Sequence, residues 1–113
     1  MEIRSLTPDL SVSPQIRPED VATIAAAGFK TIVCNRPDGE GGSEQPTFEQ
    51  IRQAAQGLGL STHYVPVVSG QITEDDVRAF QATLASAPKP VFAYCRSGTR
   101  STNLYALVRQ REG

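Results

Sequence analysis

The chain has 113 residues, of which 39% are hydrophobic and 20% charged, a size and composition that favour one globular domain. Its formal net charge is −1 and like charges are not clustered, which argues against a nucleic-acid-binding surface. No apolar stretch is long enough to span a membrane, and the N-terminal residues lack the features of a secretory signal, so we expect a cytoplasmic protein.

The first half of the chain contains two predicted strands separated by a predicted helix. The sequence LSVS (10–13) favours a short strand. Residues 17–28 favour a helix, because a proline and two acidic residues stand near its start and a glycine ends it. The compact run KTIVCN (30–35) is typical of a buried strand, and residues 36–46, rich in Gly and Pro, are predicted to form a loop.

The second half continues this alternation of strands and helices. An apolar stripe predicts a helix over 47–59, and a strand is predicted over 61–68. Residues 73–87 show the clearest helical pattern, with a threonine that can cap the first turn. The apolar run PVFAYC (90–95) predicts the last strand, and residues 101–110 are predicted to form a closing helix.

Strands and helices that alternate in this way predict an α/β fold with a parallel sheet. We therefore expect residues 1–113 to form a single small domain, with a central, mostly parallel sheet of about four strands flanked by helices. In such sheets, ligands bind beyond the carboxyl ends of the strands. This rule selects three loops as candidate sites: 35–46, 68–73 and 95–101.

The sequence CRSGTRS (95–101) places a cysteine at the end of the last strand and leads into the closing helix. Backbone N–H groups of this loop and the N-terminus of the helix can converge on an anion. Gly98 allows a backbone conformation that other residues resist. Arg100 adds a permanent charge, and Ser101 is expected to donate a hydrogen bond to a thiolate.

These features stabilise a thiolate, so Cys95 is the candidate nucleophile and Arg100 its catalytic partner. The alternative is a buried strand cysteine followed by an ordinary helix-capping turn. The joint presence of Cys, Gly, Arg and Ser at these positions favours the anion-binding loop. The residues predicted to bind the anion are Arg96, Ser97, Gly98, Thr99 and Ser101.

The loop 36–46 is expected to add residues to the same edge of the sheet. Arg36 is predicted to contact the anion, and Asp38 is grouped with it, more as a residue that orients an arginine than as an acid; a plain turn is the alternative. Cys34 is interpreted as a buried core residue, with a resolving thiol for Cys95 as the alternative. Two cysteines and one histidine are too few for a disulfide framework or a zinc site, so we expect no metal and no cofactor.

Four segments of the chain carry a resemblance to a known bacterial family: 32–40, 64–67, 72–80 and 95–101. Together they resemble the phosphatase-like domain of the β-lactamase hydrolase-like proteins, and the length of the 95–101 loop is similar to that of rhodaneses. The resemblance implies a fold like that of dual-specificity phosphatases. It also implies a fused or interacting sulfide-oxidation enzyme as partner, and it is compatible with both phosphatase and sulfurtransferase activity.

Two features of the sequence favour sulfur over phosphate. Four residues separate Cys95 from Arg100, as in the rhodanese pattern, whereas the protein-phosphatase signature has five. Residues 68–71 also lack the aspartate that acts as general acid in dual-specificity phosphatases. The first prediction is therefore a rhodanese-type sulfurtransferase. It would move sulfane sulfur from a small anionic donor, thiosulfate or a glutathione persulfide, through a Cys95 persulfide to a thiol acceptor.

Two alternative functions stay open at this point. A cysteine-based phosphatase would use the same thiolate to attack a phosphate ester and would form a phosphocysteine on Cys95. A non-catalytic module would bind an anion and regulate a partner enzyme, although a pure binding site has no need of a thiol. An intact-mass experiment with thiosulfate or a persulfide donor separates the first prediction from both alternatives.

Overall fold

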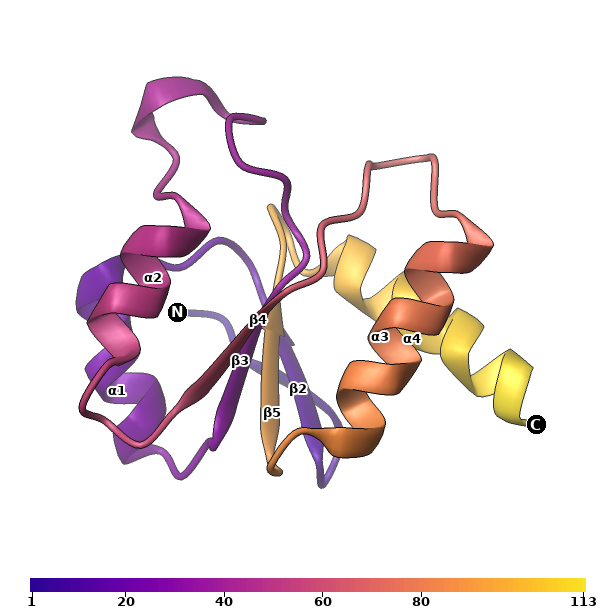
Figure 1. Cartoon of the computed structure of the whole chain (residues 1–113), viewed down its shortest axis with the longest axis horizontal. Helices are drawn as coiled ribbons and strands as arrows, with labels where there is room; N and C mark the ends of the chain where they lie inside the picture. Colours follow the sequence, from indigo (N-terminus) through magenta and orange to yellow (C-terminus); the bar gives the residue numbers. More distant parts are fainter.

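Five strands form the central sheet in this computed structural model, which describes all residues 1–113 (Figure 1). In spatial order they are β1 (Arg4–Thr7), β2 (Leu10–Ser13), β5 (Val91–Tyr94), β3 (Thr31–Cys34) and β4 (Ser61–Tyr64). β1 pairs antiparallel with β2, and all other pairs are parallel. The predicted α/β fold with a mostly parallel sheet is confirmed, with one strand more than expected.

The additional strand is β1, which the sequence pattern does not predict. Arg4 and Ser5 are exposed, and the next two residues of the strand are only half-buried. An edge strand has a neighbour on one side only, so its sequence need not show the continuous apolar run of a central strand. A two-residue turn joins β1 to β2, and this hairpin brings the N-terminal segment beside the rest of the sheet.

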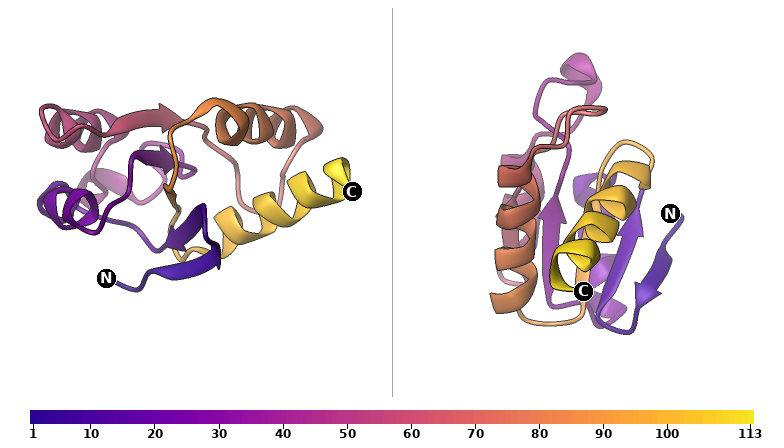
Figure 2. Two further views of the ribbon diagram at one scale, coloured as in Figure 1. Left: turned by 90° about the horizontal axis from the view of Figure 1, so that it is seen from below. Right: turned by 90° about the vertical axis from the view of Figure 1, so that its right-hand side faces the viewer.

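Helices cover both faces of the sheet (Figures 1 and 2). On one face lie α1 (Val21–Ala26), which follows the 3-10 turn η1 (Pro18–Asp20), and α2 (Phe48–Ala55). On the other face α3 (Glu74–Ser86) packs against α4 (Thr99–Glu112). A second 3-10 turn, η2 (Gly42–Glu44), interrupts the long loop between β3 and α2.

The hydrophobic core has two parts, one on each face of the sheet. Side chains of β5 alternate between them: Val91 and Ala93 belong to the cluster under α3 and α4, whereas Phe92 and Tyr94 belong to the cluster under α1 and α2. All residues of β2, β3 and β5 are buried, as is typical of parallel strands covered on both sides. The strand that leads to Cys95 is therefore fixed from both faces.

Helix α2, which follows β3, and helix α3, which follows β4, both begin after capping threonines. The Thr47 hydroxyl accepts a hydrogen bond from the Gln50 N–H, and the Thr73 hydroxyl accepts one from the Asp76 N–H. The side chains of Gln50 and Asp76 each accept a hydrogen bond from the N–H of the threonine, which completes two capping boxes. These contacts fix where α2 and α3 start, and they occupy the Asp76 carboxylate.

Several element boundaries differ from the sequence prediction; for example, the helix expected over 47–59 ends at Ala55. The strand expected over 61–68 ends at Tyr64, but the N–H groups of Val65 and Val67 still donate to the carbonyl oxygens of Cys34 and Asn35, at 2.9 and 3.0 Å. The chain thus stays beside the end of β3 before it turns toward α3. The closing helix α4 begins two residues before the predicted start at 101.

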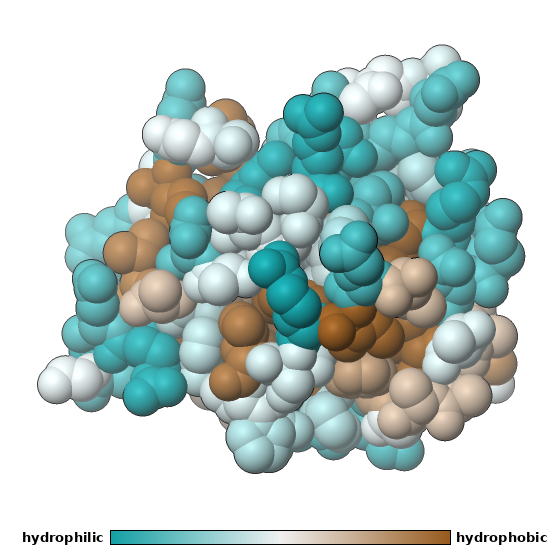
Figure 3. Space-filling view, turned by 180° about the vertical axis from the view of Figure 1, so that it is seen from behind, coloured by the Kyte–Doolittle hydropathy of each residue, from teal (hydrophilic) through white to brown (hydrophobic).

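The carboxyl ends of β2, β3, β4 and β5 lie at the same edge of the sheet, because these strands are parallel. The loops that follow them converge there, at the top of Figure 1. The space-filling view in Figure 3 shows mostly hydrophilic residues along this upper edge. The fold therefore assembles a polar surface where the sequence predicts a site. No helix of the structure combines the length and the apolar composition needed to cross a membrane.

Candidate active site

Cys95 lies directly after β5, at the base of the predicted loop. Its backbone N–H donates to the Ser13 carbonyl at 3.3 Å, which continues the pairing of β5 with β2. Its Sγ accepts a hydrogen bond from the Gly98 N–H at 3.1 Å. The residue is 1% exposed, and it lines a pocket at the carboxyl edge of the sheet. The loop therefore turns around the sulfur atom and directs at least one backbone donor toward it.

Gly98 has the backbone conformation that the turn requires. Its φ angle is +88°, in the left-handed region that side-chain-bearing residues rarely adopt. A Cβ at this position would lie 2.7 Å from Nη2 of Arg4, which donates to the Ser97 carbonyl at 3.4 Å. The unpredicted strand β1 thus contributes a positively charged side chain that covers the outer side of the loop.

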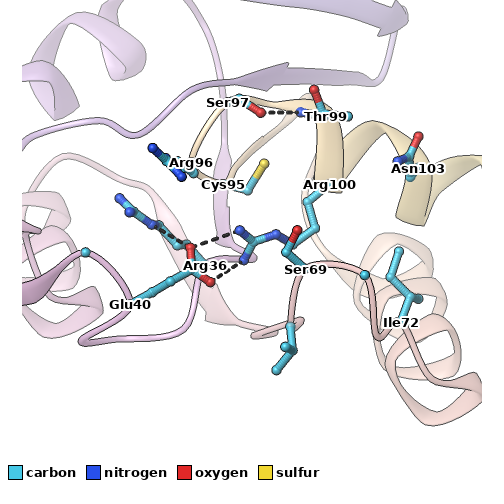
Figure 4. A pocket seen from close by; sticks show the side chains of 13 residues that line it. Arg36, Glu40, Ser69, Ile72, Cys95, Arg96, Ser97, Thr99, Arg100 and Asn103 are labelled. Carbon is cyan, nitrogen blue, oxygen red and sulfur yellow. Dashed lines mark hydrogen bonds and ion pairs between the residues drawn. The ribbon is translucent and has the colours of Figure 1, made fainter.

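Arg100 is held in one orientation by acceptors from two other loops. Its Nη1 donates to the Val67 carbonyl at 2.8 Å. The carboxylate of Glu40 accepts from both Nη1 and Nη2, each at 2.9 Å (Figure 4). Arg100 is 9% exposed, and its Nε is buried without a hydrogen-bond partner. One edge of the guanidinium is therefore occupied by protein acceptors, while the buried Nε has none.

Glu40 is the one charged residue of this site that the sequence analysis did not single out. Besides Arg100 it binds Arg36, whose Nε donates to Oε1 at 3.0 Å, while Nη1 of Arg36 donates to Gln15 at 3.2 Å. Hydrogen bonds from Arg100 in first place, and from Arg36, hold the pKa of the Glu40 carboxyl below its ordinary value. The only signal in the sequence was an acidic residue in a candidate loop, two positions after Asp38.

Asp38 does not take the place that the sequence analysis gave it. Its carboxylate accepts a hydrogen bond from the Phe48 N–H at 2.9 Å, at the start of α2. Its own N–H donates to the Tyr64 hydroxyl at 3.0 Å. Asp38 lies outside the pocket lining and orients no arginine, because that role falls to Glu40. In this fold Asp38 supports the turn and the helix start.

Ser101 also has a different partner from the one expected. Because α4 already starts at Thr99, Ser101 lies inside the first helical turn and is fully buried. Its hydroxyl donates to Oδ1 of Asn35 at 2.8 Å, and Nδ2 of Asn35 donates to the Val65 carbonyl at 2.9 Å. Ser101 therefore links the start of α4 to the segments after β3 and β4, and its hydroxyl donates to Asn35 and not to the sulfur.

The pocket above these residues has a volume of about 1080 Å³ and is open to solvent. It brings together five of the residues predicted for the site besides Cys95, with side chains drawn in Figure 4. These five are Arg36, Arg96, Ser97, Thr99 and Arg100. The residues that the sequence analysis did not select are Glu40, Gly41, Val68, Ser69, Gly70, Ile72 and Asn103.

Cys34 lies in the core under α1 and α2, as its interpretation as a buried residue suggests. Its Sγ donates to the Arg36 carbonyl at 3.2 Å. Burial raises the pKa of the Cys34 thiol, which disfavours the thiolate needed for thiol exchange. Cys34 does not line the pocket that contains Cys95, and both cysteines are free thiols.

A cysteine at the end of a central parallel strand, a tight loop and an arginine in the first turn of the next helix define a cysteine-phosphatase-like α/β domain. Residues 2–111 match the family model described as "Beta-lactamase hydrolase-like protein, phosphatase-like domain". The chain belongs to this family, in agreement with the resemblance seen in its sequence.

Named relatives agree with this assignment. The chain is 41% identical over 104 residues to a β-lactamase hydrolase-like protein of Agrobacterium fabrum. The matched region spans 92% of this chain and 24% of the relative. The chain therefore spans about a quarter of the length of the curated relatives it matches.

Solved structures show the same fold. A Neisseria meningitidis protein, provisionally named a phosphatase, is 42% identical, with a TM-score of 0.90 over 100% of this chain and 80% of that chain. A Cys-to-Ser variant of TpbA from Pseudomonas aeruginosa, solved in complex with pTyr, is 18% identical. It has a TM-score of 0.70 and covers 95% of this chain and 61% of its own, and it shows likeness of fold alone.

Proposed function

We propose that the chain is a cysteine-dependent phosphatase, a hydrolase that cleaves phosphoryl compounds through a phosphocysteine on Cys95. The observation that carries this proposal is the arrangement of Arg100 beside the Cys95 pocket. Glu40 fixes the outer edge of its guanidinium, and the buried Nε has no protein partner. A fixed arginine fork is well suited to the oxygens of a phosphoryl group. The likeness to the provisionally named phosphatase of N. meningitidis supports the same activity.

The proposed reaction has two steps with phosphorus as the reacting atom. The Cys95 thiolate attacks phosphorus, the S–P bond forms, and the P–O bond breaks with its electron pair on the leaving oxygen. Water then attacks the phosphocysteine, the S–P bond breaks, the thiolate is restored, and the protons of water stay on the released phosphate. Arg100, the loop N–H groups and the N-terminus of α4 stabilise the negative charge on the phosphoryl oxygens in both steps.

Sulfur transfer is the second candidate, and one specific feature favours it. Four residues lie between Cys95 and Arg100, which makes the loop one residue shorter than the protein-phosphatase signature. A shorter loop suits the terminal sulfur of a persulfide. The family name and the structural relatives support the phosphatase, so the sulfurtransferase that the sequence analysis placed first becomes the alternative.

Intact mass spectrometry tests both candidates in one experiment. The protein is incubated with 4-nitrophenyl phosphate or with thiosulfate, quenched in acid and weighed, while released phosphate is measured in parallel. We expect a phosphoryl adduct and steady phosphate release with the aryl phosphate, both lost in Cys95→Ser. The matched control Cys34→Ser removes the other thiol, which lies outside the pocket, and should keep the adduct.

Two other outcomes of this experiment would contradict the phosphatase. A gain of one sulfur from thiosulfate that depends on Cys95, with no phosphate release, would replace the phosphatase by the sulfurtransferase. If neither adduct forms, the non-catalytic anion-binding module becomes the better description. A small anionic substrate, a fused or interacting partner enzyme and a cytoplasmic location stay predictions from the sequence.

A further inference from the structure

Cleavage of a phosphate ester leaves negative charge on the departing oxygen. An alkoxide is a strong base, so enzymes that release one place a general acid where it can donate a proton to the leaving group. A general acid contributes typically ~10²–10⁴-fold to the rate. The carboxyl groups around this pocket therefore decide which leaving groups the site can expel.

Glu40 is the one carboxylate among the 13 residues that line the pocket. Its Oε1 accepts from Nη2 of Arg100 at 2.9 Å and from Nε of Arg36 at 3.0 Å, and its Oε2 accepts from Nη1 of Arg100 at 2.9 Å. A proton on either oxygen would compete with these charge-assisted hydrogen bonds. The two arginines thus keep Glu40 ionised, as a positioning residue and not as a proton donor.

Three aspartates on neighbouring segments have partners of their own. Asp38 accepts from the Phe48 N–H at the start of α2. On α3, Asp76 completes the capping box with Thr73, and Asp75 pairs with Arg78. None of these three aspartates lines the pocket.

The loop before α3 offers no acid either. Its residues Val68, Ser69, Gly70, Gln71 and Ile72 carry no carboxyl group, so closure of this loop alone would not deliver a proton donor. The residue of the pocket best placed by charge to interact with a departing group is Arg96, an exposed side chain that makes no ion pair in the structure. A cation stabilises a leaving group that departs as an anion.

We infer that the site, if it is the phosphatase proposed above, acts on phosphoryl compounds whose leaving group departs without a proton. Aryl phosphates, acyl phosphates and phosphoric anhydrides form this class, and alkyl phosphates such as phosphoserine lie outside it. In the first step the S–P bond forms and the P–O bond breaks. The electron pair stays on the leaving oxygen, which departs as a phenolate, carboxylate or phosphate anion and takes up a proton later from water.

Three phosphate monoesters that each carry one aromatic ring test this inference on the intact chain: 4-nitrophenyl, phenyl and benzyl phosphate. They differ mainly in the basicity of the leaving oxygen, and benzyl phosphate releases an alkoxide. The quantity to measure is kcat/KM, because it reports the steps up to cleavage of the P–O bond even when hydrolysis of the phosphocysteine limits kcat. We expect a steep fall along the series, with benzyl phosphate at least ~10²-fold below phenyl phosphate.

Glu40→Gln shows whether Glu40 donates a proton. Glutamine keeps the size and one acceptor oxygen but has no acidic proton. We expect Glu40→Gln to lower kcat/KM by the same factor for all three esters, so that its dependence on the leaving group runs parallel to that of the wild type. If Glu40 were the acid, the variant would lose most with benzyl phosphate and the dependence would become steeper.

The inference and the proposed function fail in different ways. Values of kcat/KM for the three esters within tenfold of one another, together with a trapped phosphocysteine, would overturn the inference and keep the phosphatase. A steeper dependence in Glu40→Gln would do the same and would identify the acid. No turnover of any ester and no phosphocysteine would overturn the phosphatase, and the inference with it.

Discussion

At the scale of single residues, the site depends on which donors of the Arg100 guanidinium bind the protein and which do not. Glu40 and the Val67 carbonyl occupy the two Nη atoms of Arg100, and Nε is left without a partner. The Arg100 side chain is therefore already oriented before a substrate binds. Less conformational entropy remains to be lost when an anion binds, which is the advantage of a preorganised site.

The substitution Arg100→Lys should keep the positive charge but lose the planar guanidinium with its several fixed donors. A lysine ammonium has no planar fork, so it cannot bind Glu40 along one edge and an oxyanion along another. We expect kcat/KM for 4-nitrophenyl phosphate to fall by ~10²–10³-fold, the size of effect seen when a preorganised donor is removed. Arg96→Lys is the matched control in the same loop and should lose less than tenfold, because Arg96 is exposed and forms no ion pair. Equal losses in the two variants would contradict the role given to Arg100.

At the scale of elements, the active-site loop is supported from outside by the edge strand β1. Arg4 of this strand donates to the Ser97 carbonyl and lies against Gly98. An edge strand whose only contribution to the core is the half-buried Leu6 thus contributes to the shape of the loop. The same holds on the inner side, where Ser101 in α4 binds Asn35 after β3.

Gly98→Ala tests the loop conformation, and Gly39→Ala is its matched control. Both glycines have positive φ, at +88° and +83°, so both variants strain the backbone by about 1–2 kcal/mol. A Cβ at Gly39 meets open space, whereas one at Gly98 meets Arg4 at 2.7 Å and the Ser13 backbone at 3.4 Å. We expect Gly98→Ala to lower the free energy of unfolding at least as much as Gly39→Ala, and to lower kcat/KM as well. Urea unfolding and the aryl phosphate assay measure both effects; unchanged activity in Gly98→Ala would show that the loop tolerates a side chain there.

At the scale of the whole molecule, the features that could be predicted from the sequence are those that depend on residues close together in the chain. The buried strands, the loop that begins at Cys95 and the left-handed glycine follow from apolar runs and from residue types at adjacent positions. The partner of Arg100 does not, because Glu40 lies 60 positions away along the chain. Asp38 and Glu40 are both acidic and two residues apart, and only the path of their loop decides which one reaches an arginine.

The same ion pairs make the stability of the whole chain depend on pH. Arg100 and Arg36 lower the pKa of Glu40 from its ordinary value of 4.5. A group with a lowered folded-state pKa stabilises the fold above its unfolded pKa, and this contribution is lost as pH falls through the folded pKa. Glu40→Gln should therefore reduce the free energy of unfolding at neutral pH by about 1–3 kcal/mol. The difference from wild type should shrink progressively below pH 4.5.

Glu44→Gln serves as the control for this measurement, because Glu44 is exposed and forms no ion pair. Its free energy of unfolding should match that of the wild type at every pH. Chemical denaturation of the three proteins at several pH values provides the comparison. A difference for Glu40→Gln that stays constant down to the acid limit would show that the ion pairs do not stabilise the fold.

The position of Arg4 also bears on how the protein should be handled. This side chain contacts the outer side of the active-site loop from only three residues after Met1, so a polypeptide joined to the N-terminus is attached close to a residue that supports this loop. Helix α4 leads away from the loop for 14 residues, about 21 Å, before it reaches Gly113. An affinity tag or a surface tether is therefore better attached at the C-terminus, where it leaves the contact between Arg4 and the loop undisturbed.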